Sequence, residues 1–173
     1  MKYLKLFETF INIGELNLTQ EELNSILKGY IDAALWTEEE ILKNQLPEID
    51  FNEDDEDDEK DEIEKIIQLH DSLNRKSIDN FTREDIDNDS LIDAYADIKK
   101  FIQLAGKKPV EYAIGEIGLE RLGHDIWLTR NGHGSGFFDH SFDEDFERPL
   151  MDAGRKLGIK TLYVGDDMKL YFD

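Results

Sequence analysis

Apolar and polar positions in the N-terminal half of the chain alternate with the period of an α-helix. Between residues 23 and 35, apolar side chains recur at alternating intervals of three and one, so they share one face of a helix. Thr19 and Glu22, just before this stripe, have the spacing of a capping box, in which each side chain accepts a hydrogen bond from a backbone N–H group. The pattern predicts an amphipathic helix that begins near Thr19, and residues 2–13 predict a further helix before it. The stripe consists of Leu23, Ile26, Leu27, Tyr30, Ile31, Ala34 and Leu35.

Two more segments carry the same period. Residues 91–105 form a second long stripe, which follows Asp89 and Ser90 as candidate capping residues. It ends at Gly106, and glycine is common just after the last residue of a helix. A shorter stripe predicts a helix over residues 62–74. The N-terminal half is therefore predicted to consist of amphipathic helices.

The period changes from His124 onward. Residues 124–130 (HDIWLTR) and 136–140 (GFFDH) contain many aromatic and β-branched side chains, a composition typical of strands. Residues 131–135, which lie between them and contain two glycines, favour a hairpin loop. We therefore expect a first β-hairpin over residues 124–140.

A helix and a second hairpin complete the C-terminal part. Residues 143–157 have a helical pattern that ends at Gly158. Residues 161–164 and 169–172 predict two strands around the turn 165–168. The C-terminal part is thus expected to be β-β-α-β-β and to form a small antiparallel sheet covered by helices.

Together these elements predict a single α+β domain over residues 1–173, with a sheet-containing core over residues 115–173. The chain has 173 residues, of which 39% are hydrophobic, enough to bury one core. Seven consecutive acids, Glu53–Glu59, interrupt the pattern. Because like charges at this density repel one another, we expect residues 52–61 to be an acidic flexible loop.

The charge of the chain restricts its partners. There are 41 acidic and 20 basic residues, which give a formal net charge of -21 at pH 7. Affinity for nucleic acids comes mainly from lysine and arginine contacts to phosphates, so direct nucleic-acid binding is disfavoured, as is an anionic membrane surface. A basic protein, for example a nucleic-acid-binding protein, is the favoured class of partner. The chain has no cysteine and no long apolar run, which fits a cytoplasmic protein without disulfides.

One candidate for chemistry is a histidine cluster. His124, His133 and His140 lie within seventeen positions of one another, and histidine with carboxylate can bind a divalent metal or form a general acid–base pair. In the expected hairpin His133 is at the turn, about 20 Å from the other two, too far to share an ion with them. His124 and His140 would meet at the open end, with Asp125 or Asp139 as further metal ligands. The alternative is that these histidines serve the hairpin's own structure and that the chain holds no cofactor.

A second candidate is a calcium loop over residues 85–96. Four aspartates occupy positions 1, 3, 5 and 9 of an EF-hand count, but Ser90 replaces the glycine at position 6 and Ala96 the glutamate at position 12. An acidic helix N-terminus, which the helix dipole stabilises, accounts for the same residues. The four aspartates are Asp85, Asp87, Asp89 and Asp93.

The acidic surface itself is a third candidate. DNA presents one phosphate per about 3.4 Å of each strand, and carboxylates one helical turn apart repeat at about 5.4 Å. A rigid acidic face can therefore imitate a track of phosphates and occupy the DNA-binding groove of another protein. The alternative is that the acidic surface provides solubility alone.

The segment Gly123–Asp139, GHDIWLTRNGHGSGFFD, resembles a motif of small uncharacterised phage and prophage proteins. The resemblance continues at Tyr30–Trp36 (YIDAALW) and at Leu162–Tyr171 (LYVGDDMKLY), where the family usually has glycine in place of Met168. Together these segments cover about a third of the chain. The resemblance implies a phage-encoded protein inside a bacterial host cell, and it implies no activity.

The motif also suggests where contacts lie. Arg130, Asn131 and His133 lead into the glycine-rich loop, and loops carry function more often than core strands do, so we expect them at an interaction surface. We expect Trp127 and Phe138 to pack inside the fold. The acidic run adds Glu53, Asp54, Asp55, Glu56, Asp57 and Asp58 to the predicted interaction surface.

These observations favour a non-catalytic phage accessory protein that binds a host or phage protein, with an acidic DNA-mimicking surface that would inhibit host defence or serve host takeover. A metal-dependent hydrolase or nuclease-like enzyme built on the histidine–aspartate hairpin is the first alternative. A minor virion or structural component is the second alternative.

Overall fold

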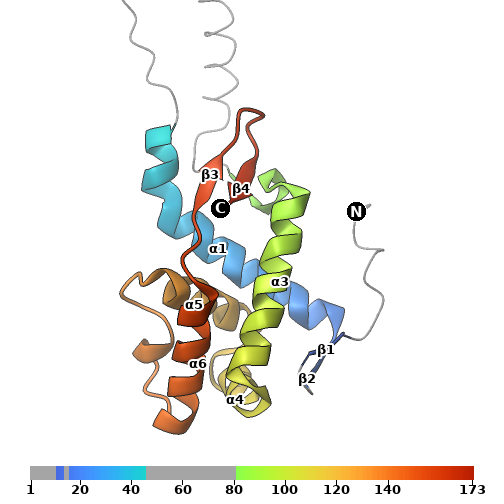
Figure 1. The fold of residues 1–173 in the computed structure, drawn as a ribbon, viewed down its shortest axis with the longest axis vertical. Coiled ribbons are helices and arrows are strands. Elements are labelled where there is room, and N and C mark those ends of the chain that lie inside the picture. Colours follow the sequence, from blue (N-terminus) through green and yellow to red (C-terminus); the bar gives the residue numbers. More distant parts are fainter. Residues whose placement is uncertain (1–10, 14–15, 46–80) are drawn as a thin grey trace, which may run out of the picture.

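The computed structural model describes residues 11–13, 16–45 and 81–173 (Figure 1). The helix predicted over residues 62–74 and the acidic loop over residues 52–61 lie outside the described residues. The same is true of the predicted contacts Glu53–Asp58. Of the helix predicted over residues 2–13, only Ile11–Ile13 is described, and it is a β-strand, so the prediction is wrong there.

The described part contains five α-helices and two short antiparallel sheets, which confirms the α+β class. None of these helices is long and apolar enough to cross a membrane. The helices are α1 (Gln20–Gln45), α3 (Asn88–Ala105), α4 (Lys107–Ile117), α5 (Leu119–Asn131) and α6 (Glu144–Leu157), with the 3-10 helices η3 (Arg83–Asp85) and η4 (Phe137–Asp139). Strand β1 (Ile11–Ile13) pairs with β2 (Leu16–Leu18), and β3 (Leu162–Val164) pairs with β4 (Leu170–Phe172).

The predicted N-terminal signals of α1 are confirmed, whereas those of α3 differ by a few residues. At α1 the backbone N–H of Thr19 donates to Glu22 Oε2 at 2.7 Å, and the N–H of Glu22 donates to Thr19 Oγ1 at 3.2 Å. Helix α3 is capped by Asp87, whose carboxylate accepts from the N–H of Asp89 at 2.9 Å. Asp89 and Asp93 lie inside α3, so these acids form a helix N-terminus and not a calcium loop.

The first β-hairpin, predicted over residues 124–140, is wrong. Residues 119–131 form helix α5, and the glycine read as part of a hairpin loop, Gly132, ends that helix with a left-handed φ of 67°. Helix α5 contacts α1, α3, α4 and α6, so it buries side chains on several faces. Because buried side chains lie on several sides of this helix, its sequence shows no apolar stripe with a helical period, and such a segment cannot be told from a buried strand by period alone.

The second hairpin and the helix before it are confirmed. Helix α6 begins after Asp143 and ends at Gly158, as its pattern predicts. Strands β3 and β4 form the predicted antiparallel pair. Met168, in the turn between them, is the one non-glycine residue of the described part with a positive φ, at 61°. That conformation favours glycine.

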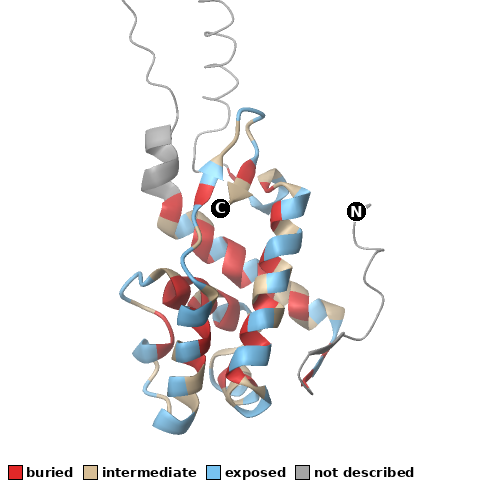
Figure 2. Cartoon of the chain, in the orientation of Figure 1, coloured by how far each residue is buried: buried red, intermediate tan, exposed pale blue. Residues whose placement is uncertain are grey.

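Helices α1 and α5 cross at the centre of the molecule with their backbones in direct contact. A Cβ atom added at Gly29 would lie 1.7 Å from the carbonyl oxygen of Glu120, and one added at Gly123 would lie 1.8 Å from that of Ile26. Only glycine permits this approach. Figure 2 shows buried residues concentrated along these two helices and exposed residues on the outer sides of α3, α4 and α6.

The core around this crossing is aromatic. The Tyr30 and Trp127 rings meet edge to face with centroids 5.1 Å apart, and Trp127 Nε1 donates to Thr37 Oγ1 at 2.8 Å. Phe101 stacks on Phe137 with centroids 5.5 Å apart. Aromatic pairs of this kind contribute about 0.5–1.5 kcal/mol beyond their buried area.

Strand β4 ties the C-terminal hairpin to the start of α3. The N–H of Asp87 donates to the carbonyl oxygen of Leu170 at 2.9 Å, and the N–H of Phe172 donates to Ser90 Oγ at 3.1 Å. In Figure 1 the hairpin lies beside the green start of α3, while α4 and the lower part of α6 lie at the other end of the molecule. This contact brings two acidic segments of the sequence together.

Candidate interaction surface

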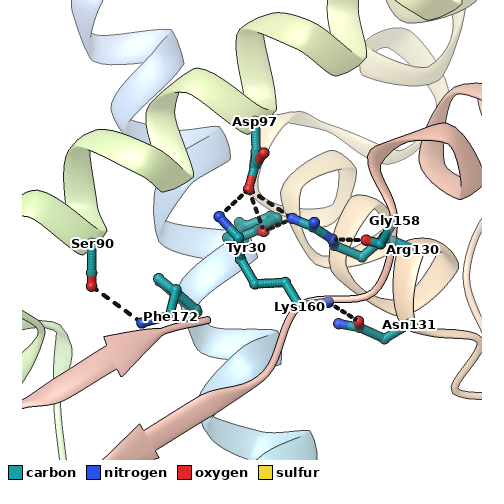
Figure 3. A network of polar contacts seen from close by, with 8 residues as sticks. All are labelled: Tyr30, Ser90, Asp97, Arg130, Asn131, Gly158, Lys160 and Phe172. Carbon is teal, nitrogen blue, oxygen red and sulfur yellow. Dashed lines mark hydrogen bonds and ion pairs between the residues drawn. The ribbon is translucent and has the colours of Figure 1, made fainter. Parts of the chain in front are cut away.

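Arg130, predicted to lie at a contact surface, is instead the centre of a buried polar network (Figure 3). Its Nη1 donates to Asp97 Oδ2 at 2.7 Å and also to the hydroxyl of Tyr30, and its Nε donates to the carbonyl oxygen of Gly158 at 2.8 Å. Lys160 Nζ lies 2.6 Å from the same oxygen of Asp97. The network joins α1, α3, α5 and the segment after α6, so its role lies inside the fold.

In this network the carboxylate of Asp97 is balanced by two cations, Arg130 and Lys160. Burial alone would raise the pKa of Asp97, but the hydrogen bonds from Lys160 and Arg130 outweigh it and hold that pKa below its ordinary value. Burial raises the pKa of the Tyr30 hydroxyl, which therefore stays protonated at neutral pH. A charge pair of this kind is strongly destabilising to break, because the remaining partner is left buried and unpaired.

The other two motif residues predicted at the contact surface also face neighbouring elements. Asn131 Oδ1 accepts from the N–H of Lys160 at 2.9 Å. His133 Nε2 lies 3.6 Å from Oε1 of Glu38, a residue of α1 that is only 3% exposed. Burial raises the pKa of the Glu38 carboxyl group, and His133 opposes that shift. The loop after α5 is thus held against α1.

The predicted metal ligands are only partly brought together. Asp125, fully buried on α5, accepts a contact of 2.6 Å from His140 Nε2 and lies 3.1 Å from Arg121 Nε and 3.8 Å from His124 Nδ1. Asp139 is elsewhere, because its carboxylate accepts from the N–H of Gly136 at 3.3 Å within η4. His124 and His140 both contact Asp125, but from a helix and a loop, because the hairpin predicted to bring the two histidines together does not form.

The contacts around Asp125 favour a role in stabilising the fold over a role as a metal site. Among the residues that the structure describes, no three histidine, aspartate or glutamate side chains are arranged so that they could hold a metal ion. Burial raises the pKa of Asp125, whereas the Arg121 guanidinium lowers it and already supplies the positive charge that a cation would bring. Because Asp125 has no exposed surface, it cannot touch a substrate. Its contact with His140 holds the loop after α5 on the helix.

The aromatic residues of the motif divide between core and surface. Trp127 is fully buried, as predicted. Phe138 is 46% exposed, so the packing predicted for it is wrong, and its neighbour Phe137 fills the core instead. Trp36 of α1 is 63% exposed and stacks on the His124 ring with centroids 5.9 Å apart.

Exposed carboxylates occur in both segments that meet where the C-terminal hairpin contacts the start of α3. They are the exposed carboxylates that precede or begin α3 and those in the β3–β4 turn: Glu84, Asp89, Asp93, Asp166 and Asp167. Lys169, in the β3–β4 turn, has its Nζ 3.9 Å from Asp87 Oδ1 and 3.7 Å from Asp167 Oδ2. We call these five acids the acidic end of the fold.

Sequence reasoning missed the acidic end as a unit. Its two parts are separated by about 80 positions and are joined by contacts of β4 with the segment that begins α3, among them the bridge between Ile86 and Leu170. The sequence predicts each part separately, one as an acidic helix start and the other as a turn. No sequence pattern indicates that the two parts are close in space.

Comparison of the chain with protein-family models, with curated proteins and with solved structures finds no match.

Proposed function

We propose that this chain is a non-catalytic binding protein that engages a basic surface of a host or phage protein, in the manner of a DNA mimic, inside an infected bacterial cell. The observation that carries the proposal is the acidic end, in which α3 and the β3–β4 turn both carry exposed carboxylates and are joined by backbone contacts of β4. The phage setting rests on the resemblance of the Gly123–Asp139 motif.

The scaffold under these carboxylates supports the proposal. Asp89 and Asp93 lie one turn apart on α3, at about the 5.4 Å repeat of a helix. The hairpin is fixed to that helix by the backbone bond from Asp87 to Leu170. Charges held on a rigid surface lose less conformational entropy on binding than charges on an unstructured segment.

The alternative of a metal-dependent enzyme has weaker support. Its best ligand set centres on Asp125, which is buried and paired with Arg121 and His140. We therefore favour binding over catalysis for this chain.

The test uses the full chain as bait for bacterial lysate, with bound proteins eluted by a salt gradient and identified by mass spectrometry. One variant neutralises the acidic end: Asp89→Asn, Asp93→Asn and Asp166→Asn. A matched control removes the same charge from exposed residues of α4 and α6: Glu116→Gln, Glu144→Gln and Asp152→Asn. We expect both variants to fold, because all six side chains are exposed.

We expect the wild type and the control to retain a basic DNA-handling protein that moderate salt releases, because exposed charge pairs are screened by salt. The acidic-end variant should lose it. Equal loss in both variants would show that net charge alone is responsible and would overturn the proposed surface. A bait that retains no basic protein at all would overturn the proposed function.

A further inference from the structure

The turn between β3 and β4 encloses a depression that is separate from the buried networks. It has a volume of about 420 Å³ and is open to solvent. Its walls are two tyrosines and two aspartates together with backbone of the turn: Tyr163, Val164, Gly165, Asp166, Asp167 and Tyr171. Two of these residues, Asp166 and Asp167, belong to the acidic end.

The two tyrosines form a fixed aromatic wall. Tyr163 and Tyr171 are direct partners across the β3–β4 pair, with ring centroids 5.6 Å apart and ring planes 25° apart. The Tyr171 hydroxyl donates to Asp167 Oδ2 at 3.0 Å. That hydrogen bond raises the pKa of Tyr171 to about 12, so the hydroxyl remains a donor at neutral pH.

Glycine at position 165 makes room for this wall. A Cβ atom added at Gly165 would lie 2.5 Å from Cε2 of Tyr171, so any other residue would push the ring away from the turn. The Tyr171 ring therefore lies directly against the backbone of the turn. Tyr163 remains 38% exposed, which leaves it accessible to a partner.

The charges around the wall are mostly negative. Both aspartates are exposed, and Lys169 contacts only Asp167 of the two, at 3.7 Å. Within the described part of the chain, Asp166 forms no ion pair of its own. A carboxylate beside an aromatic face is the environment that attracts an organic cation.

We propose that this depression receives an arginine side chain of the basic partner, an inference that rests on the proposed function and names the chemistry of its contact. A guanidinium group is planar, so it can stack on a tyrosine ring. Its N–H groups can at the same time donate to a carboxylate such as Asp166. A lysine ammonium group makes the charge contact but lacks the planar stacking surface.

The test compares two basic peptides, hexa-arginine and hexa-lysine, titrated into the full chain by calorimetry at one fixed ionic strength. The wild type should bind hexa-arginine about two- to fivefold more tightly, the range that a cation–π contact at an exposed site supplies. Tyr163→Leu keeps the net charge and an apolar side chain, and it should lower hexa-arginine affinity to that of hexa-lysine. Asp166→Asn should weaken hexa-arginine more than Asp152→Asn, which removes the same charge from α6. Thermal melting of each variant checks that the fold is retained.

Three results would overturn the inference. They are equal affinity of the wild type for both peptides, equal weakening of both peptides by Tyr163→Leu, and equal effects of Asp166→Asn and Asp152→Asn. Each of these still allows salt-sensitive binding of a basic protein, so the pocket would fail while the proposed function stands. Binding of neither peptide would overturn both.

Discussion

Replacing Gly123 by alanine would place a methyl group where α1 already has backbone atoms. The added Cβ would lie 1.8 Å from the carbonyl oxygen of Ile26, and restoring an ordinary contact of 3.4 Å requires a movement of about 1.6 Å. Neither side of this contact is a flexible side chain, so the movement must separate the two helices. Tyr30 and Trp127, which pack across the same crossing, would then lose contact.

The expected change in the free energy of unfolding follows from two opposing effects. Overpacking of a well-packed site costs about 1–3 kcal/mol, and backbone on both sides puts this site at the upper end. Alanine stabilises a helix by up to about 1 kcal/mol relative to glycine. We expect Gly123→Ala to lower the free energy of unfolding by about 2 kcal/mol, which corresponds to a fall in Tm of about 4–8 °C for a chain of this size.

The assay is thermal unfolding followed by far-UV circular dichroism, with Gly115→Ala as the control. Gly115 lies in α4, and a Cβ atom added there meets nothing within 4 Å. The control therefore isolates the propensity effect and should raise Tm by about 2–4 °C. If Gly123→Ala is as stable as Gly115→Ala, the close crossing of α1 and α5 does not exist and the reasoning fails.

Two further predictions concern buried carboxyl groups and pH. Because Lys160 and Arg130 hold the pKa of Asp97 below its ordinary value, its stabilisation is present above that ordinary pKa and is lost as pH falls below it. The excess stability of the wild type over Asp97→Asn, measured by urea unfolding, should therefore shrink on acidification, and a difference independent of pH would contradict the network. Burial raises the pKa of Glu38, so its ionised form opposes folding above that raised pKa, despite the nearby His133. Glu38→Gln should be more stable than the wild type at pH 8 and lose this advantage towards pH 4, whereas a less stable variant at pH 8 would show that the contact with His133 dominates.

The elements predicted correctly from sequence are those with one buried face. Helix α1 shows an uninterrupted stripe because its outer side meets solvent, and α6 and the β3–β4 hairpin carry clear end and turn signals. The sequence of helix α5 predicts a strand and a loop because every residue from Asp125 to Arg130 is buried, which removes the helical period.

The same limit applies to the candidate sites. The sequence predicts that His124 and His140 meet across a hairpin, but the structure brings them to Asp125 from a helix and a loop, with Arg121 as a further partner. The glycine-rich loop that follows Arg130 predicts a surface position for it, yet its partner Asp97 is 33 positions away on another helix. Contacts at such separations depend on packing, which no local spacing reveals.

The crossing of α1 and α5 also has a consequence for the order in which the protein is made. Trp127 bonds to Thr37, which precedes it by 90 positions, and Arg130 bonds to Tyr30, 100 positions earlier. At about 5–20 residues per second of translation, roughly 5–20 s separate the synthesis of α1 from that of α5. During that interval the apolar stripe of α1 has no α5 to cover it, and exposed stripes of this kind favour aggregation. The nascent chain is therefore most in need of a chaperone while α3 and α4 are being synthesised.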